Sequence, residues 1–189
     1  MLLYERLKHW GEAYRDHDRL RGVVRHAWVM HQRFRRDIRE VGSTLGSAGI
    51  EIMLLKGAAL NVNAYPDANR LMSDIDIAVP RDQLVPAIEA LERAGWKANF
   101  RNLDLLPMAT HACQFYRGDS QIDLHWEFFH GRPLDPAIMA DIWKSARTTV
   151  LDGIPYRLLS PECSLIHTCE HGLRYNSTPP MRWLADAFF

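Results

Sequence analysis

The sequence is poor in cysteine and has no long hydrophobic run. Its 189 residues include three cysteines, at positions 113, 163 and 169, with no CxxC pair. An odd number of cysteines at irregular spacing does not suit the disulfide framework of a small secreted domain and fits a reducing compartment. No apolar run approaches the length that spans a membrane, and the N-terminus lacks the apolar stretch of a secretory signal. We therefore expect a cytoplasmic protein without a membrane partner.

Net charge of either sign is also missing. The chain has 23 basic and 23 acidic residues, which gives a formal net charge of 0 with neutral histidines. Proteins that hold polynucleotides mainly through phosphate contacts are more often clearly basic, so nucleic acid is a disfavoured partner. Basic residues do gather near the N-terminus, at Arg33, Arg35, Arg36 and Arg39. We interpret them as the solvated face of a helix.

Apolar residues recur at helical or strand spacing along most of the chain. Steps of three and four from about His17 to Ala48 predict one long N-terminal helix. Strands are expected near 51–55, 73–79, 111–117 and 121–128 and as a hairpin over 148–159, and helices near 81–95, 135–147 and 160–173, with a last helix from about Met181. This order predicts an α+β fold, in which a small mixed sheet of about four to five strands is flanked by helices on one side.

The same pattern predicts three parts of the chain. Residues 1–49 form an N-terminal helical segment, 50–159 form the core around the sheet, and 160–189 form a C-terminal helical part. The chain ends inside an expected helix, so we expect that last part to be incomplete.

Two short acidic strands are candidates for a metal site. Residues two apart in a strand share a face, so Asp74 and Asp76 project to one side while Ile75 and Ile77 face the core. Adjacent carboxylates repel unless a cation or solvent separates them. Asp123, in the strand 121–126, would complete a three-carboxylate cluster if the two strands are neighbours. Oxygen ligands of this kind suit Mg²⁺ or Mn²⁺, and paired ions serve phosphoryl and nucleotidyl transfer.

A strand that ends at a lysine and a glycine precedes these carboxylates. Leu54 and Leu55 run into Lys56 and Gly57, followed by small residues from Ala58. Such a turn can present backbone N–H groups at a helix N-terminus to a phosphate, and Lys56 adds a cation there. A surface lysine before a simple turn is the alternative interpretation.

The motifs together resemble a known family. The stretch LLKGAALNVNAYPDANRLMSDIDIAVPRDQLVPAIEALERAGW combines a Leu-Lys-Gly strand end, a Tyr-Pro loop, an arginine before Asp-Ile-Asp, and a helix that ends in glycine plus an aromatic residue. Asp-Leu-His-Trp follows at 123–126, then Ser-Pro-Glu at 160–162 and Arg-Trp-Leu-Ala-Asp at 182–186. From about Ala27 to its end, the chain resembles the uncharacterised nucleotidyltransferase family of the DNA polymerase β-like superfamily.

The resemblance implies roles for individual residues. Asp74 and Asp76 would bind Mg²⁺ (or Mn²⁺) together with the triphosphate, and Asp123 would hold the catalytic metal and help to deprotonate an acceptor hydroxyl. Lys56, Gly57 and Ala58 would form the phosphate-binding turn, with Arg70 close to the same charge. Much of the superfamily has a serine where this chain has Ala58, so the grip on phosphate would depend on backbone N–H groups and Lys56. His125 and His111 are possible auxiliary residues on the same face.

The expected function is therefore Mg²⁺-dependent transfer of a nucleoside monophosphate from an NTP to the hydroxyl of an unknown acceptor. One alternative is a catalytically silent module of the same fold that binds nucleotide or a partner. A more distant one is a zinc hydrolase, because His167, Glu170 and His171 spell HxxEH, with Cys163 one turn earlier. A helix whose histidine and cysteine face packs against the sheet is the simpler interpretation of that motif.

Overall fold

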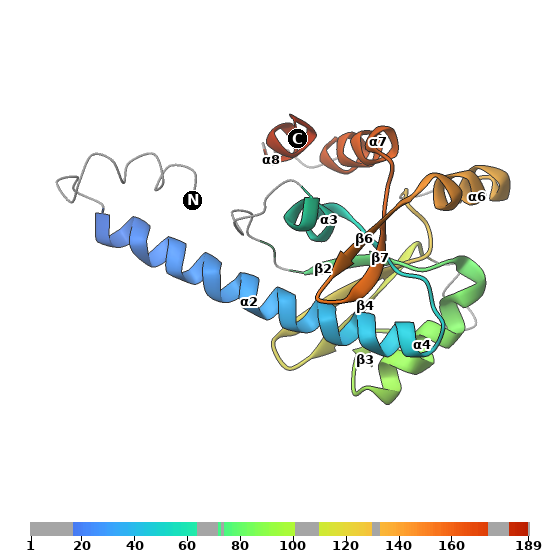
Figure 1. The fold of residues 1–189 in the computed structure, drawn as a ribbon, viewed down its shortest axis with the longest axis horizontal. Coiled ribbons are helices and arrows are strands. Elements are labelled where there is room, and N and C mark those ends of the chain that lie inside the picture. The colour runs from blue at the N-terminus through green and yellow to red at the C-terminus, as the bar shows by residue number, and fades with distance from the viewer. Residues whose placement is uncertain are drawn as a thin grey trace.

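A computed structural model describes residues 17–63, 72, 74–100, 110–129, 133–173 and 182–188 (Figure 1). The helices are α2 (His17–Ser47), α3 (Lys56–Asn63), α4 (Leu84–Arg93), α6 (Pro136–Ser145), α7 (Pro161–Gly172) and α8 (Arg182–Phe188). The strands are β1 (Met53–Leu54), β2 (Ile75–Ala78), β3 (Lys97–Ala98), β4 (Ala112–Arg117), β5 (Ser120–His125), β6 (Arg147–Leu151) and β7 (Ile154–Leu158). None of the described helices is long and apolar enough to cross a membrane.

The strands form one mixed sheet in the order β3-β4-β5-β2-β1-β7-β6. In its centre β2 is parallel to β5 and antiparallel to β1, and β1 is parallel to β7. The mixed α+β character is thus as predicted, but the described residues form seven strands, so the expectation of four to five is wrong. One cause is β3, whose two residues are too few to show the alternation that reveals a strand.

Both predicted hairpins are present. β4 pairs with β5 and β6 pairs with β7, each in an antiparallel register. The turn of the second hairpin holds Asp152 at φ 52° and Gly153 at φ 81°. Two successive residues in the left-handed region match the twist of hairpin strands, which is why Asp-Gly predicted this turn.

Helices cover both faces of the sheet, so the expectation of helices on one side is wrong. Leu54 and Ile77 point to the face that packs on α2 and α4 in the larger core. Met53 and Ala78, their neighbours along the strands, point to the other face and pack with α6 in a smaller core. In Figure 1, α2 and α4 lie on one side of the sheet and α6 lies on the other. Because β1 and β2 carry apolar residues on both faces, each face needs a cover.

The long helix α2 is an integral part of the larger core. Its buried stripe runs through Ala27, Phe34, Ile38, Val41 and Leu45, which are among the apolar positions that predicted the helix. Phe34, Ile38, Val41 and Leu45 pack against the sheet together with α4. The proposed boundaries at residues 49 and 159 stay a prediction.

Candidate active site

Asp76 and Asp123 face each other at the centre of the sheet. β2 and β5 are parallel neighbours, and their register places Asp76 opposite Asp123. The two acidic strands are therefore neighbours, which is the condition on which a carboxylate cluster depended. Ile75 and Ile77 face the larger core, as their alternation with the acidic residues predicted.

Two basic groups contact one oxygen of Asp76. Lys56 Nζ donates to Asp76 Oδ1, and His125 Nε2 lies 3.0 Å from the same atom. Asp76 is only 4% exposed. Burial alone would raise the pKa of Asp76, but the hydrogen bond from His125 and the charge of Lys56 outweigh it and hold that pKa well below its usual range. Asp76 is therefore a buried carboxylate that stays ionised.

Asp123 has the opposite electrostatic character. Its side chain is partly buried and accepts a hydrogen bond of 3.1 Å from Gln121 Nε2. Burial raises the pKa of Asp123, and the negative charges of Asp76 and Asp74 raise it further. A carboxylate whose pKa is pushed upward is better suited to accept a proton than an ordinary surface carboxylate.

The cluster has the composition of a cation site. Asp76, Asp123 and His125 each offer one ligand atom, and these atoms lie within 4.8 Å of one another. Within the described part of the chain no other group of three acidic, histidine or cysteine side chains meets this condition. Asp74 lies outside this group, partly buried at the start of β2, although its charge acts on Asp123. The structure thus brings two of the three predicted carboxylates together and adds His125.

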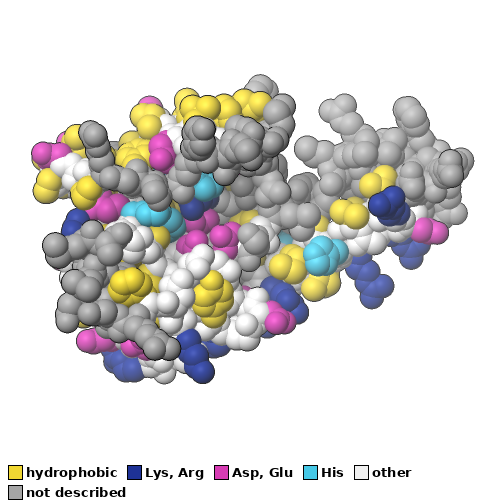
Figure 2. Space-filling model, turned by 180° about the vertical axis from the view of Figure 1, so that it is seen from behind, with side chains coloured by type: hydrophobic (Ala, Val, Ile, Leu, Met, Phe, Trp, Pro, Cys, Tyr) yellow, Lys and Arg dark blue, Asp and Glu magenta, His cyan; other side chains and the backbone are white. Residues whose placement is uncertain are grey.

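A hollow of about 260 Å³ opens beside the carboxylates. Its lining comes from four elements and includes the predicted residues Lys56, Gly57, Asp74 and Asp76, together with Leu60, Met72, Thr168, His171, Trp183 and Asp186. Figure 2 shows acidic side chains gathered with histidine and basic side chains in the middle of one face of the molecule. We call this hollow the main cleft.

Of the residues predicted to bind phosphate, Lys56 and Gly57 lie at the start of α3, whereas Ala58 is buried in the core. Lys56 begins α3 with a φ of 44°, in the left-handed region, and Gly57 follows in the first turn. Ala58 is fully buried in the larger core, and its N–H donates to the carbonyl oxygen of Leu55 at 3.0 Å. Ala58 therefore does not line the main cleft. Arg70 lies outside the described residues.

The two auxiliary histidines are neighbours. The ring centroids of His111 and His125 lie 5.7 Å apart, because His125 is paired across the sheet with Ala112. His125 is buried and bonds to Asp76, so it is part of the site itself.

Within the described residues, the HxxEH motif is not assembled into a zinc site. His167 is buried against Phe129, at 6.2 Å between ring centroids, whereas His171 is exposed at the main cleft. Cys163 packs against the smaller core around α6. Among the residues described, this helix contributes to no group of three close metal ligands. The simpler interpretation, a helix with an inward histidine, is confirmed for His167.

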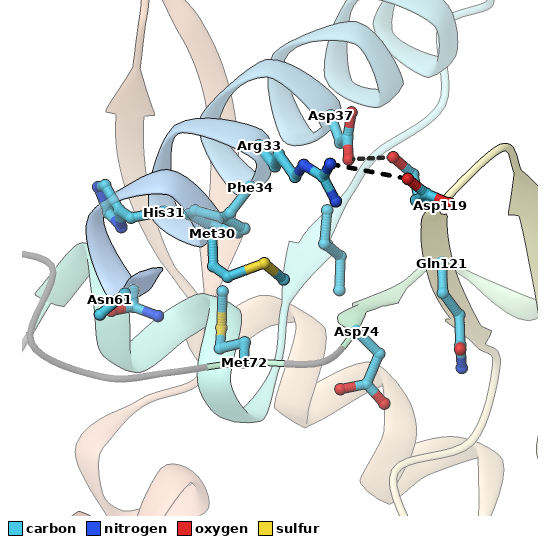
Figure 3. A pocket seen from close by; sticks show the side chains of 13 residues that line it. Met30, His31, Arg33, Phe34, Asp37, Asn61, Met72, Asp74, Asp119 and Gln121 are labelled. Atoms are coloured by element: carbon cyan, nitrogen blue, oxygen red, sulfur yellow. Dashed lines mark hydrogen bonds and ion pairs between the residues drawn. The ribbon is translucent and has the colours of Figure 1, made fainter. Parts of the chain in front are cut away.

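A second, smaller hollow of about 40 Å³ adjoins the carboxylates from the side of α2 (Figure 3). Met30 and Met72 meet across it, and Arg33 pairs with Asp119 at its rim. Met72 and Asp74 line this hollow and also the main cleft. Asp74 therefore stands where the two hollows meet.

Sequence reasoning did not identify Gln121, Thr168 or Asp186 as site residues. Gln121 could have been identified from the sequence, because it precedes Asp123 by two residues and so shares its face of β5. Thr168 and Asp186 come from α7 and α8, and only the tertiary packing of these helices brings them to the cleft.

Comparison with known proteins identifies the family of this chain. The model of a protein family described as uncharacterised nucleotidyltransferase matches residues 1–188. The chain belongs to this family. No match was found among curated proteins.

Solved structures show the same fold at low sequence identity. The solution structure of the antibiotic-resistance factor ANT(2'')-Ia gives a TM-score of 0.60 at 13% identity, over 83% of this chain and 82% of that one. Its crystal structure in complex with adenylyl-2''-tobramycin gives 0.58 at 15% identity, over 82% and 85%. A putative nucleotidyltransferase from Thermotoga maritima, TM1012, gives 0.55 at 13% identity, over 83% and 96%. The predicted nucleotidyltransferase-like fold is thereby confirmed.

Proposed function

We propose that this protein transfers a nucleoside monophosphate from an NTP to the hydroxyl of an acceptor, with release of pyrophosphate. The observation that carries the proposal is the pairing of Asp76 with Asp123 beside Lys56, at the edge of a cleft in a nucleotidyltransferase-like fold. The acceptor oxygen bonds to the α-phosphorus, and the bond from that phosphorus to the bridging oxygen of pyrophosphate breaks. The acceptor proton passes to Asp123.

The donor set fits a divalent cation. Asp76 Oδ1 is engaged by Lys56 and His125, which leaves Oδ2 for another ligand. Asp123 and Asp74 add further carboxylate oxygens close by. Such oxygens suit Mg²⁺ and Mn²⁺. When bound there, the ion would supply charge stabilisation to the transferring phosphoryl group.

Lys56, the start of α3, Asp123 and Gln121 each have a role in the proposed reaction. Lys56 contributes positive charge where negative charge develops on the leaving pyrophosphate. The N–H groups at the start of α3, around Gly57, offer further donors to phosphate oxygens. Asp123, with its raised pKa, is placed to receive the acceptor proton. Gln121 fixes the orientation of Asp123 through its hydrogen bond.

The acceptor is proposed to be a small molecule. The ANT(2'')-Ia crystal structure holds adenylyl-2''-tobramycin, which is a nucleotidylated small molecule. The charge balance of the present chain also disfavours a polynucleotide acceptor.

The test is release of pyrophosphate from each of the four NTPs, with Mg²⁺ or Mn²⁺ and pools of sugars, amino alcohols and nucleosides. The proposal predicts release with at least one combination, and a loss of a hundredfold or more in Asp123→Asn, on the order of what removal of a proton acceptor costs. Asp119→Asn is the matched control, because Asp119 is exposed in the hairpin before β5. Pyrophosphate release by Asp123→Asn at the wild-type rate would refute the proposal. No release by wild type from any pool would favour a silent nucleotide-binding module.

A further inference from the structure

Helix α7 turns polar side chains inward and apolar side chains outward. Ser164, His167 and Thr168, at helical spacing on one face, line hollows between α7 and the body of the protein. Leu165 and Ile166, on the outer side, are 49% and 57% exposed. A helix that packs on an apolar core shows the reverse arrangement. The inward polar face of α7 is therefore suited to a polar ligand.

The main cleft continues past Lys56 into a cavity of about 30 Å³ between α3 and α7. Lys56, Leu60 and Thr168 line both spaces, so the cavity and the cleft meet at these residues. The polar part of its lining consists of Lys56, Asn63, Arg147, Ser164, His167 and Thr168. The cavity is roughly twice the space that one water molecule needs. We call it the α3–α7 cavity.

His167 lines this cavity and has an unsatisfied ring nitrogen. Its ring is 3% exposed, and Nε2 has no hydrogen-bond partner within the described structure. Leaving a buried polar atom unpaired costs free energy, so a ligand atom that bonds to Nε2 would be favoured. Burial and the nearby charge of Lys56 lower the pKa of His167 to about 3, so the ring is neutral at physiological pH and Nε2 can carry a proton to donate.

The charge of the α3–α7 cavity favours an anion. Lys56 and Arg147 line it, and no carboxylate is among the described residues that do so. The hydroxyl groups of Ser164 and Thr168 can donate hydrogen bonds at the same place. Lys56 is also paired with Asp76, so an anion in the cavity would share its charge. Together with Arg147 and three neutral donors, this lining suits phosphoryl oxygens better than a neutral ligand.

We propose that the α3–α7 cavity receives the terminal phosphoryl group of the donor triphosphate, held by hydrogen bonds from Ser164, His167 and Thr168. This inference rests on the proposed function, because it assigns the far end of the same substrate. The reacting end lies at the carboxylates, the polyphosphate passes Lys56, and the last phosphoryl group enters beyond it. The cavity thereby distinguishes a triphosphate from a monophosphate.

Calorimetric titration of the full chain with inorganic tripolyphosphate tests the cavity without a nucleobase. The four NTPs and four NMPs are titrated alongside it, all in the presence of Mg²⁺. The test variant is Ser164→Ala/Thr168→Val, which removes two hydroxyl groups with little change of shape. The matched control is Ser43→Ala/Thr44→Val on α2, remote from both hollows. Thermal unfolding verifies that both variants remain folded.

We expect the test variant to bind tripolyphosphate about tenfold more weakly or worse, since hydrogen bonds to a charged group are lost. Binding of NMPs should be unchanged, and the control should match wild type. Equal tripolyphosphate affinity in wild type and test variant overturns the inference, as does a wild type that binds no tripolyphosphate. Selective loss of triphosphate affinity without any pyrophosphate release would preserve the cavity assignment and refute the proposed transfer reaction.

Discussion

Asp76 and His125 are joined by a hydrogen bond of 3.0 Å between two buried side chains on neighbouring parallel strands. The other ring nitrogen of His125, Nδ1, has no partner within the described residues. A proton on Nε2 therefore makes His125 a donor to Asp76 Oδ1, and this directs Oδ2 of Asp76 to a cation. In this account His125 orients a metal-binding carboxylate.

Replacing His125 tests that orientation. We expect His125→Leu to weaken Mn²⁺ binding by roughly 10- to 100-fold, which is the usual effect of losing a partner of a metal-binding side chain. His125→Gln keeps an N–H donor and should retain most of the affinity. Mn²⁺ titration by calorimetry gives the comparison, and His26→Leu, at an exposed position on α2, is the control. Unchanged Mn²⁺ affinity in His125→Leu would contradict the assignment.

The contact of Lys56 with Asp76 predicts a metal-dependent stability. Lys56→Met removes the cation beside a buried, ionised carboxylate, so we expect the metal-free protein to lose roughly 3 kcal/mol of its free energy of unfolding. A bound divalent cation supplies the missing charge, so Mg²⁺ or Mn²⁺ should stabilise the variant more than it stabilises wild type. Urea unfolding with and without metal measures both effects. Equal metal stabilisation of the two proteins would refute the prediction.

The neutral His167 predicts acid sensitivity. Its pKa is lowered to about 3 by burial and by Lys56, from an ordinary value of 6.5. Between pH 6.5 and 3 the unfolded chain binds a proton there that the folded chain does not, so stability falls as the pH falls. The slope due to this one group is at most about 1.4 kcal/mol per pH unit.

His167→Leu should flatten that dependence. Metal-free urea unfolding from pH 7 to 4.5 measures it, because the depressed pKa of Asp76 affects stability only at lower pH. His26→Leu is again the control, and it should keep the wild-type slope. A His167→Leu variant with the wild-type slope would show that His167 is protonated in the folded protein.

A close approach between α2 and β7 predicts a steric effect at Gly42. Tyr156 Oη donates a hydrogen bond of 2.8 Å to the carbonyl oxygen of Ile38, and a Cβ added at Gly42 would collide with that hydroxyl. Gly42→Ala should therefore destabilise the protein by about 1–3 kcal/mol, as overpacking does. The Gly42→Ala/Tyr156→Phe double variant should recover part of the loss, because the hydroxyl is gone. Additive losses in a double-mutant cycle would refute the steric explanation.

Local patterns predicted much of the fold. The apolar stripe of α2 and the turn at Asp152 and Gly153 appear where the sequence placed them. The alternation of polar and aliphatic residues in β2 and β5 predicted which side chains share a face, and the structure shows that the two strands are neighbours. These features are encoded within a few residues, which is why they can be predicted without tertiary information.

Features that depend on long-range packing were harder to predict. The role of His125 depends on its contact with Asp76 across two strands. The burial of Ala58 follows from the left-handed start of α3 at Lys56, which no local pattern signals. The inward polar face of α7 contradicts the usual inference that apolar residues point inward, because Leu165 and Ile166 are exposed. Sites formed by several elements commonly break such local rules.

The most direct test of the central claim is calorimetric titration of each NTP into the protein, with and without Mg²⁺, in wild type, Asp76→Asn and the exposed-site control Asp119→Asn. The account predicts that wild type and Asp119→Asn bind at least one NTP only when Mg²⁺ is present, and that Asp76→Asn loses this binding while remaining folded. NTP binding that is independent of Mg²⁺ and equal in Asp76→Asn would contradict the account.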